Sequence, residues 1–210
     1  MELTWYGLSC FRISERKYAT VITDPYAAAF GLPELKLRGE IVTVSHAAPG
    51  HDNYKAIAQR EHLLDGPGEY EIGGVFITGI ATFHKETVLR NVIFLFDYDG
   101  LTVAHLGDMQ EVPTQKQIEA LEQVNVLLLP VGGGKSLNAA QAAEVVSMLE
   151  PNIVVPMHYH TPGLTLELEG VERFLKEMGV TDPKVEATLK VSSINLPEET
   201  ETVILAPRVQ

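Results

Sequence analysis

The sequence has little cysteine, few basic residues and no long apolar run, and each absence excludes a class of protein. Cys10 is the single cysteine among 210 residues, so the chain forms no internal disulfide. Lysine and arginine number 16 against 28 aspartates and glutamates, a formal net charge of −12, and no basic patch suits a nucleic acid. No apolar run reaches the roughly 20 residues that span a bilayer. We therefore expect neither nucleic acid nor a membrane among its partners.

The length of the chain predicts a single domain over residues 1–210. Its hydrophobic content of 45% is enough for a sizeable core. No signal peptide or lipidation motif is recognisable, so we expect a cytoplasmic protein. Cys10 lies in an apolar stretch, which favours a small buried side chain over a nucleophile. The sequence leaves the oligomeric state open, a homo-oligomer included.

Short strand patterns fill the first half of the chain, and helical patterns appear in the second. Strands are predicted over residues 3–6, 10–13, 20–23, 41–45, 75–82, 92–98, 101–104, 126–129, 153–155, 187–191 and 202–205. Asp99-Gly100 predicts a two-residue hairpin turn. Helices are predicted over 114–121, over 138–149 with Asn138 as N-cap, and over 168–178 with Gly179 as the stop. Such a mixture is typical of an α/β fold.

Imidazole and carboxylate side chains follow four of these strand patterns. The candidate metal ligands are, in chain order, His46, His51, His84, Asp108 and His158. A strand fixes the ligands at its end, while the loop that follows leaves the metal open to a substrate. Ligand-type residues at several strand ends are far more specific than any one of them alone. The sequence therefore predicts a metal centre.

This constellation resembles the metallo-β-lactamase superfamily, and within it the small metal-dependent hydrolase branch that includes the ascorbate-6-phosphate lactonase-like proteins. The resemblance covers nearly the whole chain. Its motifs lie at residues 3–11, 23–25, 66–70, 105–108, 130–133 and 156–159. It implies a four-layer αββα sandwich and metal-dependent hydrolysis of an ester, lactone or phosphoester of a small molecule.

The second motif of this family, His-x-His-x-Asp-His, is incomplete in this chain. His46 and His51 match its first and last histidines. Ala48 stands where the family has the middle histidine, and Gly50 stands where it has the aspartate. Two of the four coordinating side chains of the motif are therefore missing.

The resemblance implies which ligands remain. An intact site would hold two metal ions bridged by Asp108, the carboxylate that we also expect to be catalytic. His46 and His84 would remain on one ion, and His51 and His158 on the other. Because three protein ligands suffice for a catalytic zinc, we expect one zinc ion or none, and another divalent transition metal is an alternative. The aspartate that Gly50 replaces also handles protons, so hydrolysis is expected to be impaired.

Two functions stay open at this stage. The first is a hydrolase with a reduced metal site, favoured by the survival of the other ligand-type residues. The second is a non-catalytic protein of the same fold with a binding or structural role, favoured by Ala48 and Gly50. Asp52 is a weaker substitute ligand, because adjacent residues point in different directions. Residues 132–136 resemble a phosphate loop but lack its spacing, which favours a tight strand-to-helix turn.

The remaining polar candidates are interpreted as supporting residues. His105 lies inside a strand pattern, which favours a structural role. Asp24 begins an Asp-Pro turn and is expected to organise the loops by hydrogen bonds, as metal centres require. His62 and His160 are expected on the surface.

Overall fold

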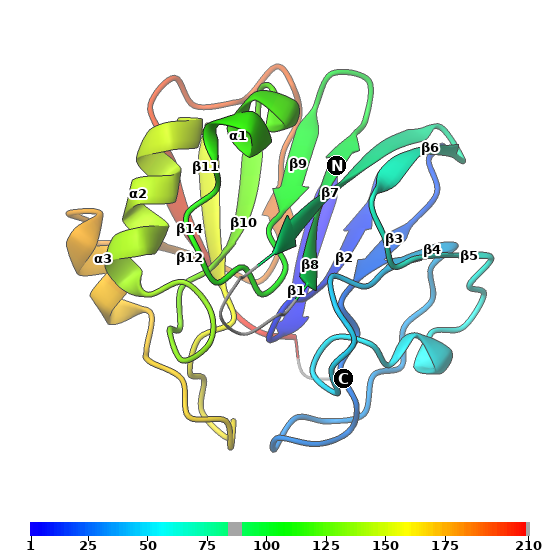
Figure 1. Cartoon of the computed structure of the whole chain (residues 1–210), viewed down its shortest axis with the longest axis horizontal. Helices are drawn as coiled ribbons and strands as arrows, with labels where there is room; N and C mark the ends of the chain where they lie inside the picture. The colour runs from blue at the N-terminus through cyan, green and yellow to red at the C-terminus, as the bar shows by residue number, and fades with distance from the viewer. Residues whose placement is uncertain (84–89, 209–210) are drawn as a thin grey trace.

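The computed structural model describes residues 1–83 and 90–208, and its strands form two sheets packed face to face (Figure 1). The first sheet has the order β13-β1-β2-β3-β4-β5. Its strands are β1 Glu2–Gly7, β2 Cys10–Ser14, β3 Val21–Thr23, β4 Ile41–Thr43, β5 His62–Leu64 and β13 Leu189–Lys190.

The second sheet has the order β12-β14-β11-β10-β9-β8-β7-β6. Its strands are β6 Gly68–Ile72, β7 Val75–Phe83, β8 Arg90–Asp97, β9 Thr102–His105, β10 Val126–Pro130, β11 Ile153–Met157, β12 Lys184–Glu186 and β14 Glu201–Leu205. The predicted hairpin joins β8 to β9, with φ angles of 56° at Asp99 and 84° at Gly100. Positive φ at both positions is what a two-residue loop of this kind demands, which confirms the prediction.

Side chains alternate between the two faces of the first sheet, and each face has its own core. Leu3, Trp5 and Phe11 belong to the large cluster that also contains the second sheet. Tyr6 and Ile22 point the other way, into a smaller cluster. Loop residues complete that smaller cluster, among them Tyr26, Leu35, Leu37 and Ile57.

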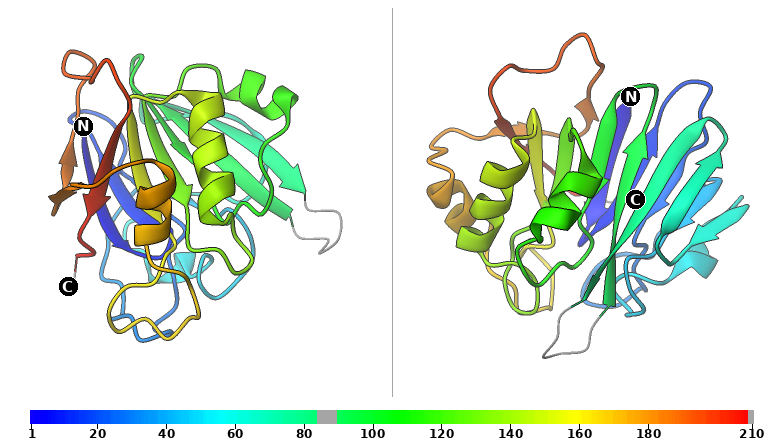
Figure 2. Two further views of the ribbon diagram at one scale, coloured as in Figure 1. Left: turned by 90° about the vertical axis from the view of Figure 1, so that its left-hand side faces the viewer. Right: turned by 45° about the horizontal axis from the view of Figure 1, so that its top comes forward.

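The helices lie against the outer face of the second sheet (Figure 2). They are α1 Gln115–Leu121, α2 Ala139–Leu149 and α3 Glu172–Glu177. Over the first sheet, the described residues supply loops and the short 3-10 helix η1 Tyr54–Ala56. The α/β sandwich is therefore confirmed, and its fourth layer is built mostly from loops. No helix among the described residues has the length and apolar character needed to cross a membrane.

Capping residues fix the starts of the two longer helices. Thr114 and Asn138 each accept a hydrogen bond from the backbone three residues on, and Gln117 and Gln141 return it. Helix α3 is shorter than the predicted 168–178. The reason is that the Glu169 N–H donates to the Gly132 carbonyl, and the Glu169 carbonyl accepts from the His160 N–H. These backbone groups are therefore bonded to neighbouring loops and not within a helix.

The strand directions bring several loops to one edge of the sandwich. β3 and β4 run parallel in the first sheet, and β9, β10 and β11 run parallel in the second. Their carboxyl ends carry the loops that hold most of the predicted metal ligands. Topology alone therefore gathers residues that are far apart in the sequence.

Candidate metal centre

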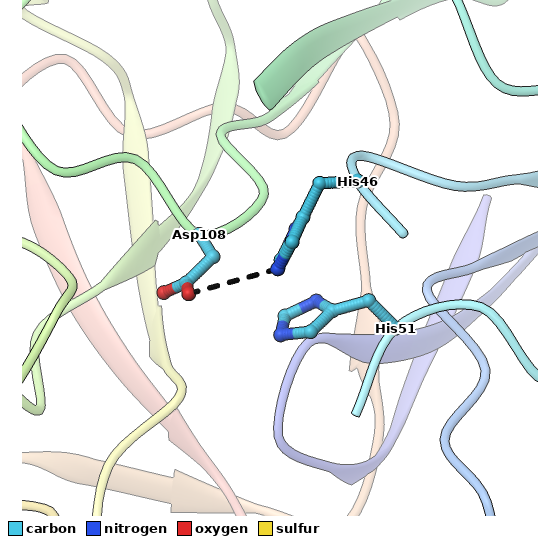
Figure 3. Close-up of side chains that lie close together, drawn as sticks. All are labelled: His46, His51 and Asp108. Atoms are coloured by element: carbon cyan, nitrogen blue, oxygen red, sulfur yellow. Dashed lines mark ion pairs between the residues drawn. The ribbon is translucent and has the colours of Figure 1, made fainter. Parts of the chain in front are cut away.

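Three of the predicted ligands form one cluster between the two sheets. The donor atoms of His46, His51 and Asp108 lie within 4.8 Å of one another (Figure 3). Nε2 of His46 is 3.9 Å from Oδ2 of Asp108, and the rings of His46 and His51 are 4.2 Å apart. Ligand atoms sit about 2 Å from a bound zinc, so small side-chain rotations bring these three onto one ion. Two imidazoles and a carboxylate fit a transition metal, and that these three side chains bind one stays a prediction.

His158, the residue that follows β11, adjoins this cluster. Its Nδ1 lies 3.7 Å from Oδ1 of Asp108, and its ring centre is 5.3 Å from that of His51. The backbone of His158 is left-handed, with φ 52°, and its N–H donates to the carbonyl of Leu8 at 3.0 Å. Non-glycine residues in this conformation are held by their surroundings and often mark functional sites. His84, the fifth predicted ligand, lies outside the described residues.

A buried carboxylate orients His51. Oδ2 of Asp24 accepts hydrogen bonds from Nδ1 of His51 at 2.8 Å and from the Ser45 hydroxyl at 2.5 Å. Oδ1 of Asp24 accepts from the Ser45 backbone at 2.7 Å. Because Nδ1 of His51 donates to Asp24, Nε2 of the neutral ring carries the lone pair that a metal needs. The expected organising role of Asp24 is confirmed.

Charge in this network is uneven. Burial alone raises the pKa of Asp24, but the hydrogen bond and positive charge of His51 lower it by more, and the net pKa is about 2. Burial lowers the pKa of His51, yet its hydrogen bond with Asp24 raises it more, and the net shift is upward. Burial lowers the pKa of His46, and it lowers that of His158 to about 4. His46 and His158 are therefore neutral at neutral pH, the form that binds metals.

Ser136 links Asp108 to His158, and sequence reasoning missed it. Its hydroxyl donates to Oδ1 of Asp108 and lies 3.1 Å from Nδ1 of His158. Ser136 and Asp108 both approach the same nitrogen of His158, Nδ1, whereas in a catalytic triad the serine and the carboxylate bond to opposite nitrogens of the histidine. Burial alone raises the pKa of Asp108, but His158, His51 and Ser136 lower it, and the net shift is downward. Asp108 is thus held ionised.

Asn91 holds the backbone that carries Asp108, and it too was not predicted. Its Oδ1 accepts from the Asp108 N–H at 3.0 Å, and its Nδ2 donates to the Leu106 carbonyl at 3.0 Å. Gly107 lies between these two residues with φ 63°, and a β-carbon there would come within 2.3 Å of Oδ1 of Asn91. The position of Asp108 therefore depends on a side chain from β8 and on a glycine that lets it approach.

The loop at residues 132–136 is a tight turn, as predicted. The Ser136 N–H donates to Gly133 at 3.0 Å, and the Gly133 N–H donates to Leu137 at 3.1 Å. A β-carbon at Gly132 would lie 2.2 Å from the carbonyl oxygen of His158. These N–H groups are used within the loop, which argues against a phosphate site. What the loop does supply is Ser136.

The other candidates lie where they were expected. His105 is buried, donates from Nε2 to the Ser9 carbonyl at 2.8 Å and accepts at Nδ1 from Gly107, which confirms a structural role. His62 and His160 are exposed. Cys10 is fully buried, and burial raises the pKa of its thiol. Asp52 is not part of the cluster of donor atoms.

Of the two motif positions without ligands, Gly50 has room for a side chain. A β-carbon at Gly50 would meet Leu8 at 3.6 Å, an ordinary contact. Ala48 is half-buried, and its carbonyl accepts from the His51 N–H at 2.8 Å. The loop therefore keeps a compact turn without the missing histidine and aspartate, and its backbone does not require glycine at position 50.

The sequence is similar to several known proteins. Residues 2–158 match the model of the family described as the beta-lactamase superfamily domain. A UPF0173 protein of Pyrococcus abyssi is 28% identical over 78% of this chain and 85% of its own length. A UPF0173 metal-dependent hydrolase of Lysinibacillus sphaericus is 26% identical over 77% of this chain and 86% of its own.

Solved structures point the same way. A protein of Thermotoga maritima assigned as a Zn-dependent hydrolase of the metallo-β-lactamase superfamily is 31% identical, with a TM-score of 0.79 and 97% of each chain covered. Igni18, a metallo hydrolase of Ignicoccus hospitalis, is 20% identical with a TM-score of 0.67, covering 91% of this chain and 99% of its own, and shows the shared fold. The family match, the two sheets and the gathered histidines lead to one conclusion: the chain belongs to the metallo-β-lactamase superfamily, and its relatives are metal-dependent hydrolases.

Proposed function

We propose that this protein hydrolyses an ester, lactone or phosphoester of a small molecule, using one zinc ion where an intact family motif would hold two. The observation that carries the proposal is the meeting of His46, His51 and Asp108 at one point between the sheets. The names of its relatives support the metal dependence. Ala48 and Gly50 support the reduced number of ions.

Each residue has a distinct task in this proposal. His46, His51 and Asp108 would hold the ion, and His158 stands beside them. When bound, zinc polarises a carbonyl or phosphoryl group and makes a water molecule acidic at neutral pH. Asp24 keeps a proton on Nδ1 of His51, so that the other nitrogen faces the centre. Ser136 holds Oδ1 of Asp108, which leaves Oδ2 on the side of His46.

Proton transfer is the weak point of this site. Gly50 offers no carboxylate, so among the cluster residues Asp108 is the remaining acidic group next to the reacting centre. Turnover is therefore expected to be slow. The rival function, a binding or structural protein of the same fold, follows if that loss abolishes catalysis altogether.

Hydrolysis assays with defined zinc content separate the two functions. Protein purified without chelator would be tested on p-nitrophenyl acetate, a chromogenic lactone and bis(p-nitrophenyl) phosphate. We expect activity on at least one substrate, lost with chelator and regained with zinc. Asp108→Asn should reduce it about 100-fold or more. Asp97→Asn, at the far end of β8, is the matched control and should leave it unchanged. Zinc binding without any zinc-dependent hydrolysis would favour the non-catalytic protein.

A further inference from the structure

A cavity of about 80 Å³ opens beside the metal centre, and the two share residues. His46 and Asp108 form part of its wall. The rest of the described wall comes from Thr82, Phe83, Arg90, Asn91, Met109, Gln110, Glu111, Val112, Thr114 and Gln117. A molecule in this cavity would lie against the cluster of His46, His51 and Asp108.

Most polar side chains on this wall are already used. Thr82 donates to the Asn91 carbonyl, and Asn91 is bonded to Thr82, Leu106 and Asp108. Gln117 caps α1 and donates to the Ala81 carbonyl. Groups that already hold the protein together offer little to a ligand.

Arg90 is different. Within the part of the chain that the structure describes, its guanidinium has no hydrogen bond or ion pair, and the residue is exposed at the start of β8. Its backbone is fixed by the ladder, where it pairs with Phe83 of β7. Its chain neighbour Asn91 holds the Asp108 backbone. An unpaired cation is thus anchored close to the candidate ligands.

We propose that Arg90 binds an oxyanion, phosphate or carboxylate, of the molecule that the metal centre acts on. The guanidinium is planar with five donors, and it matches both anions in a bidentate way. This proposal deepens the proposed function, on which it rests for the identity of the molecule as substrate. The ligand is then a small acid or its monoester, not a neutral ester.

The apolar wall defines the rest of the ligand. Phe83, which lines the cavity, is a large hydrophobic side chain that is 50% exposed. Met109 and Val112 lie on the same wall. Cross-strand partners place their side chains on one face, so Phe83 and Arg90 present a ring and a cation together. An aryl or alkyl body joined to an anionic group fits this pair.

Because the protein is acidic, the positive charge of Arg90 is needed for an anion to bind in this cavity. The formal net charge is −12, and Asp108 and Glu111 lie on the same wall as Arg90. Anions are repelled in general by such a surface. Binding of an anion here therefore depends on Arg90 and on a bound metal, and the two contributions can be measured separately.

The test uses phenylphosphonate, with its neutral dimethyl ester as the matched probe. Binding would be measured by calorimetry for the full chain, zinc-loaded and metal-free. We expect Arg90→Gln to weaken phenylphosphonate binding about 10-fold or more in both forms, because a charged hydrogen bond is lost. Arg90→Lys should recover part of that loss, since it keeps the charge. Benzoate in place of phenylphosphonate shows which oxyanion is preferred.

Arg16→Gln is the charge control. Arg16 is exposed beyond the end of β2, on a surface that shares no described residue with this cavity, and its replacement should change affinity less than about 2-fold. Equal binding by wild type and Arg90→Gln, or equal binding of the neutral ester, would overturn the proposal. If no zinc binds and nothing is hydrolysed, the proposed function fails, and the metal-free arm still decides the role of Arg90.

Discussion

The metal centre has two halves, one from each sheet, and they differ in how many ligands of the family motifs they keep. The half from the first sheet, residues 46–51, lacks ligands at Ala48 and Gly50. The half from the second sheet keeps both Asp108 and His158. Among the residues that the structure describes, the donors that remain on both sides share one property: each has a hydrogen-bonding partner among the residues that line the site. Those partners are Ser45 for His46, Asp24 for His51, and Ser136 for Asp108 and His158.

This difference shows what keeps the site in shape. Ala48 and Gly50 lie on a loop whose turn is closed by backbone bonds, so the fold tolerates the loss of their side chains. Asp24 and Ser136 are buried beneath the ligands and are tied to them. Replacing Asp24 or Ser136 should therefore disturb the position of the ligands, although the fold itself tolerates the absence of ligands at Ala48 and Gly50.

The largest effect is expected from Asp24→Ala, which breaks the half from the first sheet. The change leaves His51 and Ser45 buried without their acceptor, which costs about 3–5 kcal/mol of unfolding free energy. Urea denaturation of the metal-free protein measures it. Asp97→Ala removes a hydrogen bond to the exposed Gly100 backbone and should cost no more than about 1 kcal/mol. Similar losses in both variants would show that the Asp24 network is not special.

The second effect is a pH dependence that belongs to His158. Burial lowers its pKa from 6.5 to about 4, so the unfolded chain binds a proton before the folded one does. Stability of the metal-free protein should therefore fall as pH drops from 6.5 toward 4, by about 3 kcal/mol at most. His46 adds a shift of the same sign, while His51 adds the opposite. Urea denaturation at several pH values would measure the free energy of unfolding of wild type and of His158→Gln, and the difference between them isolates the contribution of His158. A difference that does not change with pH would refute this prediction.

Ser136→Ala tests the half from the second sheet. Loss of a residue that orients ligands usually weakens a metal site about 10–100-fold. We expect a loss of zinc affinity in that range, measured by competition with a chromogenic chelator. Ser147→Ala is the control, because that exposed hydroxyl bonds to its own helix at 3.2 Å. Unchanged affinity in Ser136→Ala would mean that Ser136 does not position Asp108 and His158.

Local sequence predicted the fold wherever a strand or helix carries its own signal. The apolar run that became β10 and the Asp-Gly turn before β9 are examples. The strands β5, β6 and β12 were missed. His62–Leu64 and Lys184–Glu186 are three residues long and show no clear alternation, and Gly68–Ile72 begins within the segment interpreted as a turn. Helix α3 was overestimated because contacts with distant loops decided it.

The site shows the same limit. His46, His51, Asp108 and His158 could be predicted because each follows a strand and matches a motif. Ser136 could not, since it approaches His158 through the parallel pairing of β10 with β11, which no local pattern encodes. Asn91 reaches Asp108 from β8 in a similar way. Ligands can be predicted from local motifs, whereas the residues that hold them in place are recognised only from three-dimensional packing.

The smallest expected effect sharpens the comparison by repair. Ala48→His together with Gly50→Asp gives the half from the first sheet its missing donors, and the space at Gly50 admits a side chain. We expect zinc affinity to rise about tenfold or more. Gain of esterase or phosphodiesterase activity would follow if the new carboxylate handles protons. A folded variant with no gain in affinity would show that the motif does not map onto positions 46–51.

The central claim is a metal centre reduced to one ion, and metal content tests it most directly. Protein purified without chelator would be loaded with zinc, dialysed exhaustively and analysed for zinc per chain. We expect at most one tightly held ion in the wild type and a higher content in the variant that carries both Ala48→His and Gly50→Asp. Two tightly held ions per wild-type chain would contradict it.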